Sequence, residues 1–284
     1  MEMLMESDYQ VGLKLWSVNT GACQREARRL YDAGVFDYLE LYAVPGTADT
    51  LAGWKALEIP CVIHAAHFKH GFNLAKVDCE ESNRLIYDEV RRFADELNAR
   101  YIIFHGGTFG CISETARQLG ALNDSRALIE NKPCITRDKG QILECRGASV
   151  EEIGQVLQQV DCGFCLDIPH ALCAANYLGL EQMSMLREMN NFQPTMYHLA
   201  DMMDTALLID DHTRLGLGVL DMAQFIPSVL APGAMVTIET NRTRPDALDE
   251  FEREVEIFRS YASGRERGRC RRGGCRRCCA TRSR

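Results

Sequence analysis

The feature that most constrains the fold is a regular alternation of short apolar segments with longer segments of helical character. Eight strand-like segments occur at residues 11–16, 36–42, 60–64, 101–105, 127–130, 163–167, 196–199 and 234–239. Such alternation favours parallel strands joined by right-handed crossovers. Eight units within about 260 residues are enough for one closed (β/α)8 barrel. We therefore expect a single α/β domain over residues 1–263, built as a closed barrel.

The segments between the strands have the composition and spacing of amphipathic helices. Helices are predicted at residues 21–33, 47–57, 80–98, 113–122, 149–160, 221–230 and 246–261, with one or two short ones within 171–189. Ser113 and Ser149 are expected to cap two of them, because a serine at a helix start accepts a backbone hydrogen bond. Residues 131–147 are expected to form a loop. An open doubly wound sheet is the alternative, but the chain lacks the glycine-rich phosphate loops typical of that fold.

Histidines and carboxylates follow the ends of the predicted strands. The clearest case is Asp167 and His170, which flank Pro169, a residue that stops further strand pairing. In a closed parallel barrel the carboxyl ends of all strands meet at one face. The side chains that we expect to converge there are His64, His67, His105, Glu130, Asp167, His170, His198, Asp201, Asp210, His212 and Glu239.

These converging side chains predict a metal site. Several carboxylates in one pocket would repel one another unless a cation neutralised them. Imidazole together with carboxylate is the ligand set of zinc, manganese or iron. Five histidines and four acidic residues exceed the roughly four to six ligands of one ion. We therefore expect two or three ions, with a carboxylate that bridges them.

Seven short motifs that contain the expected ligands occur along the chain. They are Ile63-His64-Ala65, Phe104-His105-Gly106-Gly107, Leu128-Ile129-Glu130-Asn131, Cys165-Leu166-Asp167-Ile168-Pro169-His170-Ala171, His198-Leu199-Ala200-Asp201, Asp210-Asp211-His212 and Ile238-Glu239-Thr240. In this order they resemble the xylose isomerase-like TIM barrel superfamily, and most closely its endonuclease IV branch, AP endonuclease family 2. The resemblance covers residues 11–262.

The resemblance implies a ligand set for each of three zinc ions. His64, His105 and Glu130 would hold the first ion. Glu130 would bridge to a second ion held by Asp167, His198 and Glu239. A third ion would bind His170, Asp210 and His212. Because three extra residues precede Asn73, His67 or His70 is an alternative to His64, although His64 ends its strand directly.

The implied reaction is hydrolysis of a phosphodiester, with DNA that contains an abasic site, or a small phosphorylated molecule, as substrate. Glu130 and Glu239 are the expected catalytic residues, and His67, Asn73 and Asp201 are expected to contact the substrate. The loop at residues 43–47 is short and lacks the Arg and aromatic side chains that the family inserts into damaged DNA.

A sugar isomerase or epimerase is the rival function on the same barrel. It would use one Mn²⁺ or Mg²⁺ on Glu130, Asp167, His198 and Glu239, with the two glutamates moving protons on and off a carbon. It would have no need of His105, His170 and His212. A barrel that only binds a small molecule or a protein is a third alternative, which the full ligand complement disfavours.

Charge is distributed unevenly along the chain. Residues 264–284 contain nine arginines and one glutamate, so the remaining residues carry a net charge of −16, although the total is −8. The acidic body disfavours indiscriminate nucleic-acid binding. The Arg/Cys-rich tail is expected to be disordered, because it has almost no apolar residues. A small zinc-binding or nucleic-acid-binding appendage is the alternative. Neither a signal peptide nor an apolar run long enough for a membrane helix is present, so a cytoplasmic location is expected.

Overall fold

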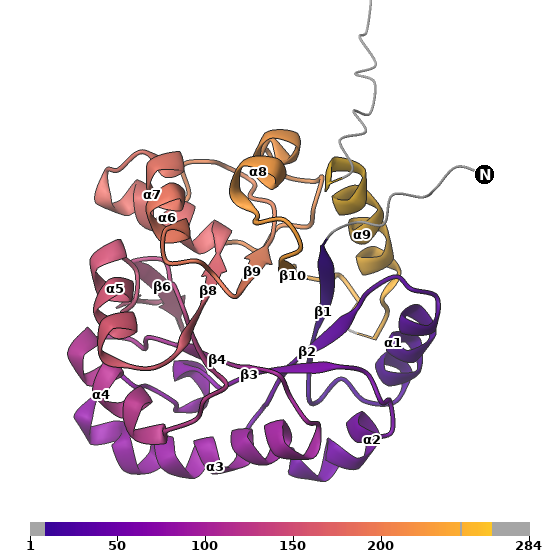
Figure 1. Cartoon of the computed structure of the whole chain (residues 1–284), viewed down its shortest axis with the longest axis horizontal. Helices are drawn as coiled ribbons and strands as arrows, with labels where there is room; N and C mark the ends of the chain where they lie inside the picture. Colours follow the sequence, from indigo (N-terminus) through magenta and orange to yellow (C-terminus); the bar gives the residue numbers. More distant parts are fainter. Residues whose placement is uncertain (1–8, 245, 263–284) are drawn as a thin grey trace, which may run out of the picture.

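The computed structural model describes residues 9–244 and 246–262, and most of them form a closed parallel barrel (Figure 1). The barrel strands are β1 (Gln10–Trp16), β2 (Tyr38–Tyr42), β3 (Cys61–His64), β4 (Ile102–His105), β5 (Ala127–Glu130), β8 (Gly163–Asp167), β9 (Met196–Leu199) and β10 (Met235–Ile238). Each strand pairs with its neighbour in parallel, and β1 closes the ring by pairing with both β2 and β10. The predicted (β/α)8 barrel is therefore confirmed.

Helices surround the barrel as an outer ring (Figure 1). They are α1 (Ala22–Asp32), α2 (Leu51–Lys55), α3 (Glu80–Glu96), α4 (Ile112–Leu122), α5 (Val150–Gln159), α6 (Ile168–Leu178), α7 (Gln182–Asn190), α8 (Met222–Val229) and α9 (Asp249–Ala262), with 3-10 turns η1 (Ala48–Thr50), η2 (Phe68–His70) and η3 (Val77–Cys79). Ser149 caps α5 as predicted. The prediction that Ser113 caps a helix was wrong. Helix α4 begins at Ile112, and Cys111 occupies the N-cap position.

Successive strand residues point to opposite faces of the sheet, so every second residue points into the barrel. The inward residues form two layers. The lower layer is apolar and consists of Tyr38, Val62, Ile103, Leu128, Cys165, Met196 and Met235. Two residues further along the same strands, the next inward positions hold Glu40, His64, His105, Glu130, Asp167, His198 and Thr237. The apolar layer is thus a floor, and the polar layer above it is held at the carboxyl ends of the strands.

The loop after β5 contains a structure that the sequence did not indicate. Residues 131–147, expected to be irregular, include an antiparallel hairpin of β6 (Ile135–Asp138) and β7 (Gln141–Glu144). Lys139 and Gly140 form its turn with positive φ angles of 46° and 83°. The hairpin strands are half-exposed, so they lack the apolar pattern that reveals a buried strand.

Two further expectations concern regions outside the barrel. Within residues 9–244 and 246–262, no helix combines the length and the apolar character needed to span a membrane. The expected disordered tail, residues 264–284, lies outside the residues that the structure describes.

Asp124 links the start of β5 to α3, and its charge should stabilise the fold. Burial alone would raise the pKa of Asp124, but hydrogen bonds from Arg126 and Tyr87 lower it from 3.8 to about 2. The folded-state pKa lies below the unfolded value, so the contribution is present above about pH 4 and is lost as the pH falls toward 2. Asp124→Asn should therefore lower the free energy of unfolding by about 1–3 kcal/mol at pH 7.

Urea denaturation from pH 7 to pH 2 tests this expectation. The difference between wild type and Asp124→Asn should shrink as the pH falls below 4. Asp88→Asn is the matched control, because Asp88 is exposed and pairs with Arg91 on the same helix. A difference that stays constant down to pH 2 would contradict the assignment.

Candidate metal centre and active site

Glu130 lies at the centre of the polar layer. Its Oε2 atom is 3.1 Å from Nε2 of His64 and 3.1 Å from Nε2 of His105. Its Oε1 atom is 3.1 Å from Nδ1 of His170. Burial alone would raise the pKa of Glu130, but His105 and Lys132 hold it well below the ordinary value, so the carboxylate is ionised. We call His64, His105 and Glu130 the histidine cluster.

A second group forms where α6 meets the long loop after β9. Asp167 ends β8 and caps α6, because its Oδ1 atom accepts a 2.7 Å hydrogen bond from the backbone N–H of His170. This cap, with Pro169 in the first turn, directs His170 into the barrel mouth. Oδ2 of Asp210 is 3.8 Å from Nε2 of His170 and 3.0 Å from Nδ1 of His212. We call His170, Asp210 and His212 the loop cluster.

The third group contains two residues that the sequence did not single out. Nζ of Lys14 is 2.6 Å from Oε2 of Glu239 and 3.1 Å from Oε1 of Glu40. Nε2 of His198 is 2.9 Å from Oε2 of Glu40, and its Nδ1 is 2.8 Å from Oε2 of Glu239. We call Lys14, Glu40, His198 and Glu239 the lysine cluster. Lys14 and Glu40 are charged residues inside otherwise apolar strands, and that signal was available in the sequence.

The nine predicted ligands thus converge, but they group differently from the expected sets. In the expected second set, Oε2 of Glu239 lies 2.8 Å from Nδ1 of His198, and carboxylate oxygens of Glu130 and Asp167 each lie 3.7 Å from the same nitrogen. His198 and Glu239 also group with Glu40, and Asp167 also groups with Glu130 and His170. Oε2 of Glu239 contacts the ammonium group of Lys14 at 2.6 Å.

The imidazoles are oriented as metal ligands usually are. A ligating histidine generally donates one ring N–H to a carboxylate or carbonyl and presents the other nitrogen to the ion. Nδ1 of His64 lies 2.8 Å from the carbonyl of Ala65, and Nδ1 of His170 lies 3.0 Å from the carbonyl of Asn131. Assigning the protons to these nitrogens leaves Nε2 of His64 facing Glu130 and Nε2 of His170 facing Asp210.

Buried atoms without hydrogen-bond partners supply a second test of metal fit. Among the described residues, the buried side-chain atoms of the site without such a partner are Oδ2 of Asp210 and Nδ1 of His105, together with Oε1 of Glu40, Nδ1 of His198 and Oε2 of Glu239 in the lysine cluster. Burial raises the pKa of Asp210 and lowers the pKa of His105, since each environment penalises the charged form. A cation would relieve both groups. The histidine and loop clusters therefore fit the ions that the resemblance implies.

In the lysine cluster, charges are already paired within the protein. Burial would lower the pKa of Lys14, but Glu239 and Glu40 raise it above its ordinary value, so the ammonium persists. Glu40 is also fully buried, and His198 and Lys14 lower its pKa to about 2 against the effect of burial. This cluster is neutralised in large part by its own lysine.

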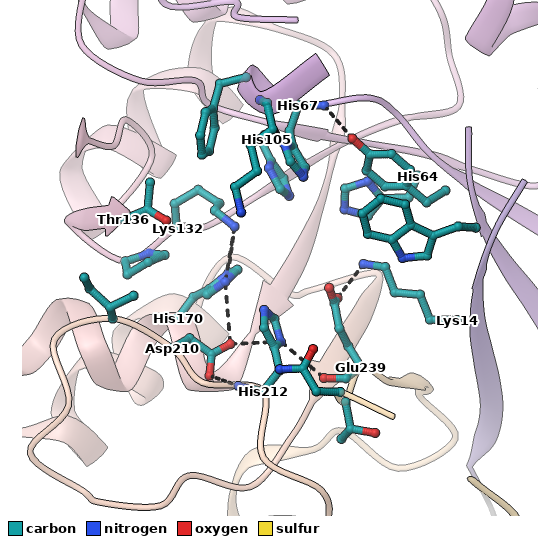
Figure 2. Close-up of a pocket in the computed structure, with 18 of the residues that line it drawn as sticks. Lys14, His64, His67, His105, Lys132, Thr136, His170, Asp210, His212 and Glu239 are labelled. Atoms are coloured by element: carbon teal, nitrogen blue, oxygen red, sulfur yellow. Dashed lines mark hydrogen bonds and ion pairs between the residues drawn. The ribbon is translucent and has the colours of Figure 1, made fainter. Parts of the chain in front are cut away.

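A cavity of about 290 Å³ opens above the three clusters (Figure 2). His67 lines it, and its ring stacks on that of His105 with the centroids 5.5 Å apart. Trp16 and Tyr42 form an aromatic wall, with ring centroids 4.5 Å apart. Lys132, which the sequence did not single out, also faces the cavity, and its Nζ is 3.2 Å from Nε2 of His170.

Two of the predicted substrate contacts do not line this cavity. Asn73 is buried and bonds to Asn83 and Thr108, where it fixes the loop after β4. Asp201 is buried and accepts hydrogen bonds from the backbone N–H groups of Met202, Gly216, Gly218 and Leu220. Both side chains hold loops in place, so the structure places only His67 of the three at the cavity.

Several solved structures share this fold. Endonuclease IV from Thermus thermophilus aligns with a TM-score of 0.66 at 20% identity, over 89% of this chain and 99% of that chain. The TTHB071 protein from the same organism, soaked with ZnCl2, gives 0.64 at 18%, over 89% and 98%. A D-tagatose 3-epimerase-like protein gives 0.64 at 16%, over 88% and 97%. An endonuclease and an epimerase-like protein thus share the barrel, which leaves the reaction open.

A search of curated proteins finds no match to this chain. A family model described as xylose isomerase-like TIM barrel matches residues 28–261, which include all of the barrel except β1. The chain therefore belongs to the xylose isomerase-like TIM barrel family.

Proposed function

We propose that this chain is a metal-dependent phosphodiester hydrolase of the endonuclease IV type. The observation that carries the proposal is the presence of two complete ligand groups in one cavity, the histidine cluster and the loop cluster, joined through Glu130. A sugar isomerase would have no need of His105, His170 or His212. Zn²⁺ is the proposed metal, since imidazole and carboxylate suit it and a structural neighbour was soaked with ZnCl2.

The cavity provides the groups that phosphodiester hydrolysis requires. Metal ions bound there would supply Lewis acidity and a water of lowered pKa. Glu130 holds the histidine cluster on one side and His170 on the other, so it sets the distance between the two groups. Lys132 faces the cavity between them, where its ammonium can bind a phosphate oxygen. The aromatic wall of Trp16 and Tyr42 offers a surface against which a sugar or base can pack.

The substrate is proposed to be a phosphodiester with a small group at the reacting centre. DNA with an abasic site and a small phosphorylated molecule both meet this description. A cavity of about 290 Å³ accommodates one compact group. The loop at residues 43–47, which follows β2, offers no long side chain to insert into a duplex. The smaller substrate is therefore favoured.

Sugar isomerisation or epimerisation remains the second candidate, because of one specific observation. Oε2 of Glu130 and Oε2 of Glu239 lie 3.7 and 2.8 Å from Nδ1 of His198. Two carboxylates on either side of a bound sugar are what proton transfer to and from a carbon requires. With one bound Mn²⁺ or Mg²⁺, Glu130 and Glu239 would be the residues that transfer the proton.

A direct assay separates the two candidates. The purified chain, loaded with Zn²⁺ or Mn²⁺, is incubated with an abasic-site oligonucleotide, with bis(p-nitrophenyl) phosphate, and with a panel of ketoses and sugar phosphates. Release of p-nitrophenol or strand cleavage in the Zn²⁺ form is expected. Interconversion of a sugar by the Mn²⁺ form, with no phosphodiester cleavage, would reverse the order of the candidates.

Lys132→Met should weaken substrate binding more than turnover. Loss of one charge-assisted hydrogen bond costs about 1.5–3 kcal/mol, which is about 10- to 100-fold in KM for a phosphodiester. Lys139→Met is the matched control, because Lys139 is exposed at the tip of the β6–β7 hairpin. Steady-state kinetics on bis(p-nitrophenyl) phosphate measures both parameters. An unchanged KM would remove Lys132 from the binding site.

A further inference from the structure

Lys14 is a buried cation at the base of the cavity. It has 8% of its surface exposed, and Nζ contacts one carboxylate oxygen of Glu239 at 2.6 Å and one of Glu40 at 3.1 Å. Figure 2 shows the side chain extending from β1 toward Glu239. An ammonium group is stable out of water only when anions surround it, and here two carboxylates do so.

The barrel itself determines where this ammonium lies. Lys14 is in the middle of β1, in register with Glu40 of the neighbouring strand β2. On its other side β1 pairs with β10, directly before Glu239. Because β1 is paired with a strand on each side, the backbone of Lys14 is held in place and cannot move as a loop would.

The lysine cluster has three buried atoms without a hydrogen-bond partner, namely Oε1 of Glu40, Nδ1 of His198 and Oε2 of Glu239. Both carboxylate oxygens face the ammonium of Lys14. Oε2 of Glu40 accepts hydrogen bonds from Thr237 at 2.7 Å and from Nε2 of His198 at 2.9 Å, while its Oε1 faces Lys14. A divalent ion added here would lie next to a fixed ammonium group and would be repelled by it. The expected second ion would have to share Oε2 of Glu239 with this ammonium group, which is 2.6 Å from that oxygen.

We propose that the ammonium of Lys14 takes the place of one metal ion in the lysine cluster, so that this chain binds two ions rather than three. The two remaining ions occupy the histidine cluster and the loop cluster. Lys14 then supplies a permanent positive charge at the base of the site and holds Glu239 in place. This count rests on the proposed hydrolase function, since a sugar isomerase would instead hold one ion on Glu130, Asp167, His198 and Glu239.

Lys132 also lies near the predicted metal ligands, but its contacts with carboxylates differ from those of Lys14. The nearest carboxylate oxygen, Oε1 of Glu130, is 3.6 Å from its Nζ, which is a longer contact than either made by Lys14. It lies on the loop after β5 and faces the cavity. Because this contact with Glu130 is longer and is made to one carboxylate rather than two, removal of Lys132 should create no new ion site.

Counting bound Mn²⁺ tests the proposal. Mn²⁺ is chosen because it prefers carboxylate and imidazole to thiolate, which limits binding by the thirteen cysteines. The full-length chain is stripped with a chelator, and the stoichiometry is measured by Mn²⁺ titration followed by electron paramagnetic resonance and by elemental analysis. Wild type and Lys14→Arg should bind two ions per chain. Lys14→Met should bind three, because the freed carboxylates regain a cation. Lys132→Met, the matched control, should bind two.

Three ions in the wild-type chain would overturn the proposal. Two ions in a Lys14→Met variant with the circular dichroism spectrum of wild type would also overturn it. If Lys14→Met does not fold, the counts for wild type and Lys14→Arg still decide, since both must be two. None of these measurements uses activity, so failure of the count can be distinguished from failure of the proposed hydrolase reaction.

Discussion

Glu130→Gln is expected to abolish activity on whichever substrate the site accepts. Glu130 contacts both histidines of the histidine cluster and His170 of the loop cluster, so both groups depend on its charge. Glutamine keeps the size of the side chain but removes that charge. The loss of several kcal/mol of transition-state stabilisation corresponds to a rate reduction on the order of 10³-fold or more.

The measurement pairs turnover with metal content. Glu130→Gln should lose bound metal as well as activity, because a neutral amide is a weaker ligand than a carboxylate. Glu188→Gln is the control, since Glu188 is exposed on α7. Wild-type turnover in Glu130→Gln would mean that the reaction takes place in another part of the molecule.

Asp201→Ala should have the second largest effect, through the long loop after β9. Asp201 accepts hydrogen bonds from four backbone N–H groups of this loop, at 2.9–3.1 Å. Its own backbone pairs with Thr213, directly after His212. Removal of the carboxylate leaves the buried N–H groups of Met202 and Leu220 without a partner, at a cost of about 3 kcal/mol in the free energy of unfolding.

The same substitution should weaken the loop cluster selectively. Asp210 and His212 lie on the loop that Asp201 holds, so affinity for the ion bound there should fall about 10- to 100-fold. Asp201→Asn keeps one oxygen acceptor and should lie between wild type and Asp201→Ala. Asp204→Ala is the control on the same loop, because Asp204 is exposed and accepts one bond, from Ala206. Equal loss of stability in Asp204→Ala would contradict a special role for Asp201.

Most of the fold was predictable because barrel strands have a repeating pattern. Residues 127–130, 163–167 and 196–199 were predicted with the boundaries that the structure shows. The β6–β7 hairpin was missed because a half-exposed hairpin buries too little apolar surface to leave a pattern. The helix expected within 171–189 begins at Ile168, since Asp167 serves both as the end of β8 and as the cap of α6.

The candidate site was predictable to the level of which strand ends converge. Each predicted ligand lies at the carboxyl end of a strand or in the segment that follows one, and a parallel barrel brings those positions together. They are His64, His105, Glu130, Asp167, His170, His198, Asp210, His212 and Glu239. Lys14 and Glu40 were missed because they lie inside strands, where a charged residue has no obvious partner in the sequence. The partner is on the adjacent strand, and the register that pairs them belongs to the closed barrel.

The sequence by itself therefore determined the barrel and the set of side chains at its open end, because the alternation of apolar and helical segments, and the residues at the end of each apolar segment, can be read along the chain. Only the tertiary structure decided how those side chains divide among themselves. Which carboxylate meets an imidazole and which meets Lys14 depends on contacts between strands far apart in the chain, such as β1 with β10. The same holds for Asp201 and Asn73. Their side chains form hydrogen bonds with backbone groups that are distant in the sequence, and so they hold loops in place.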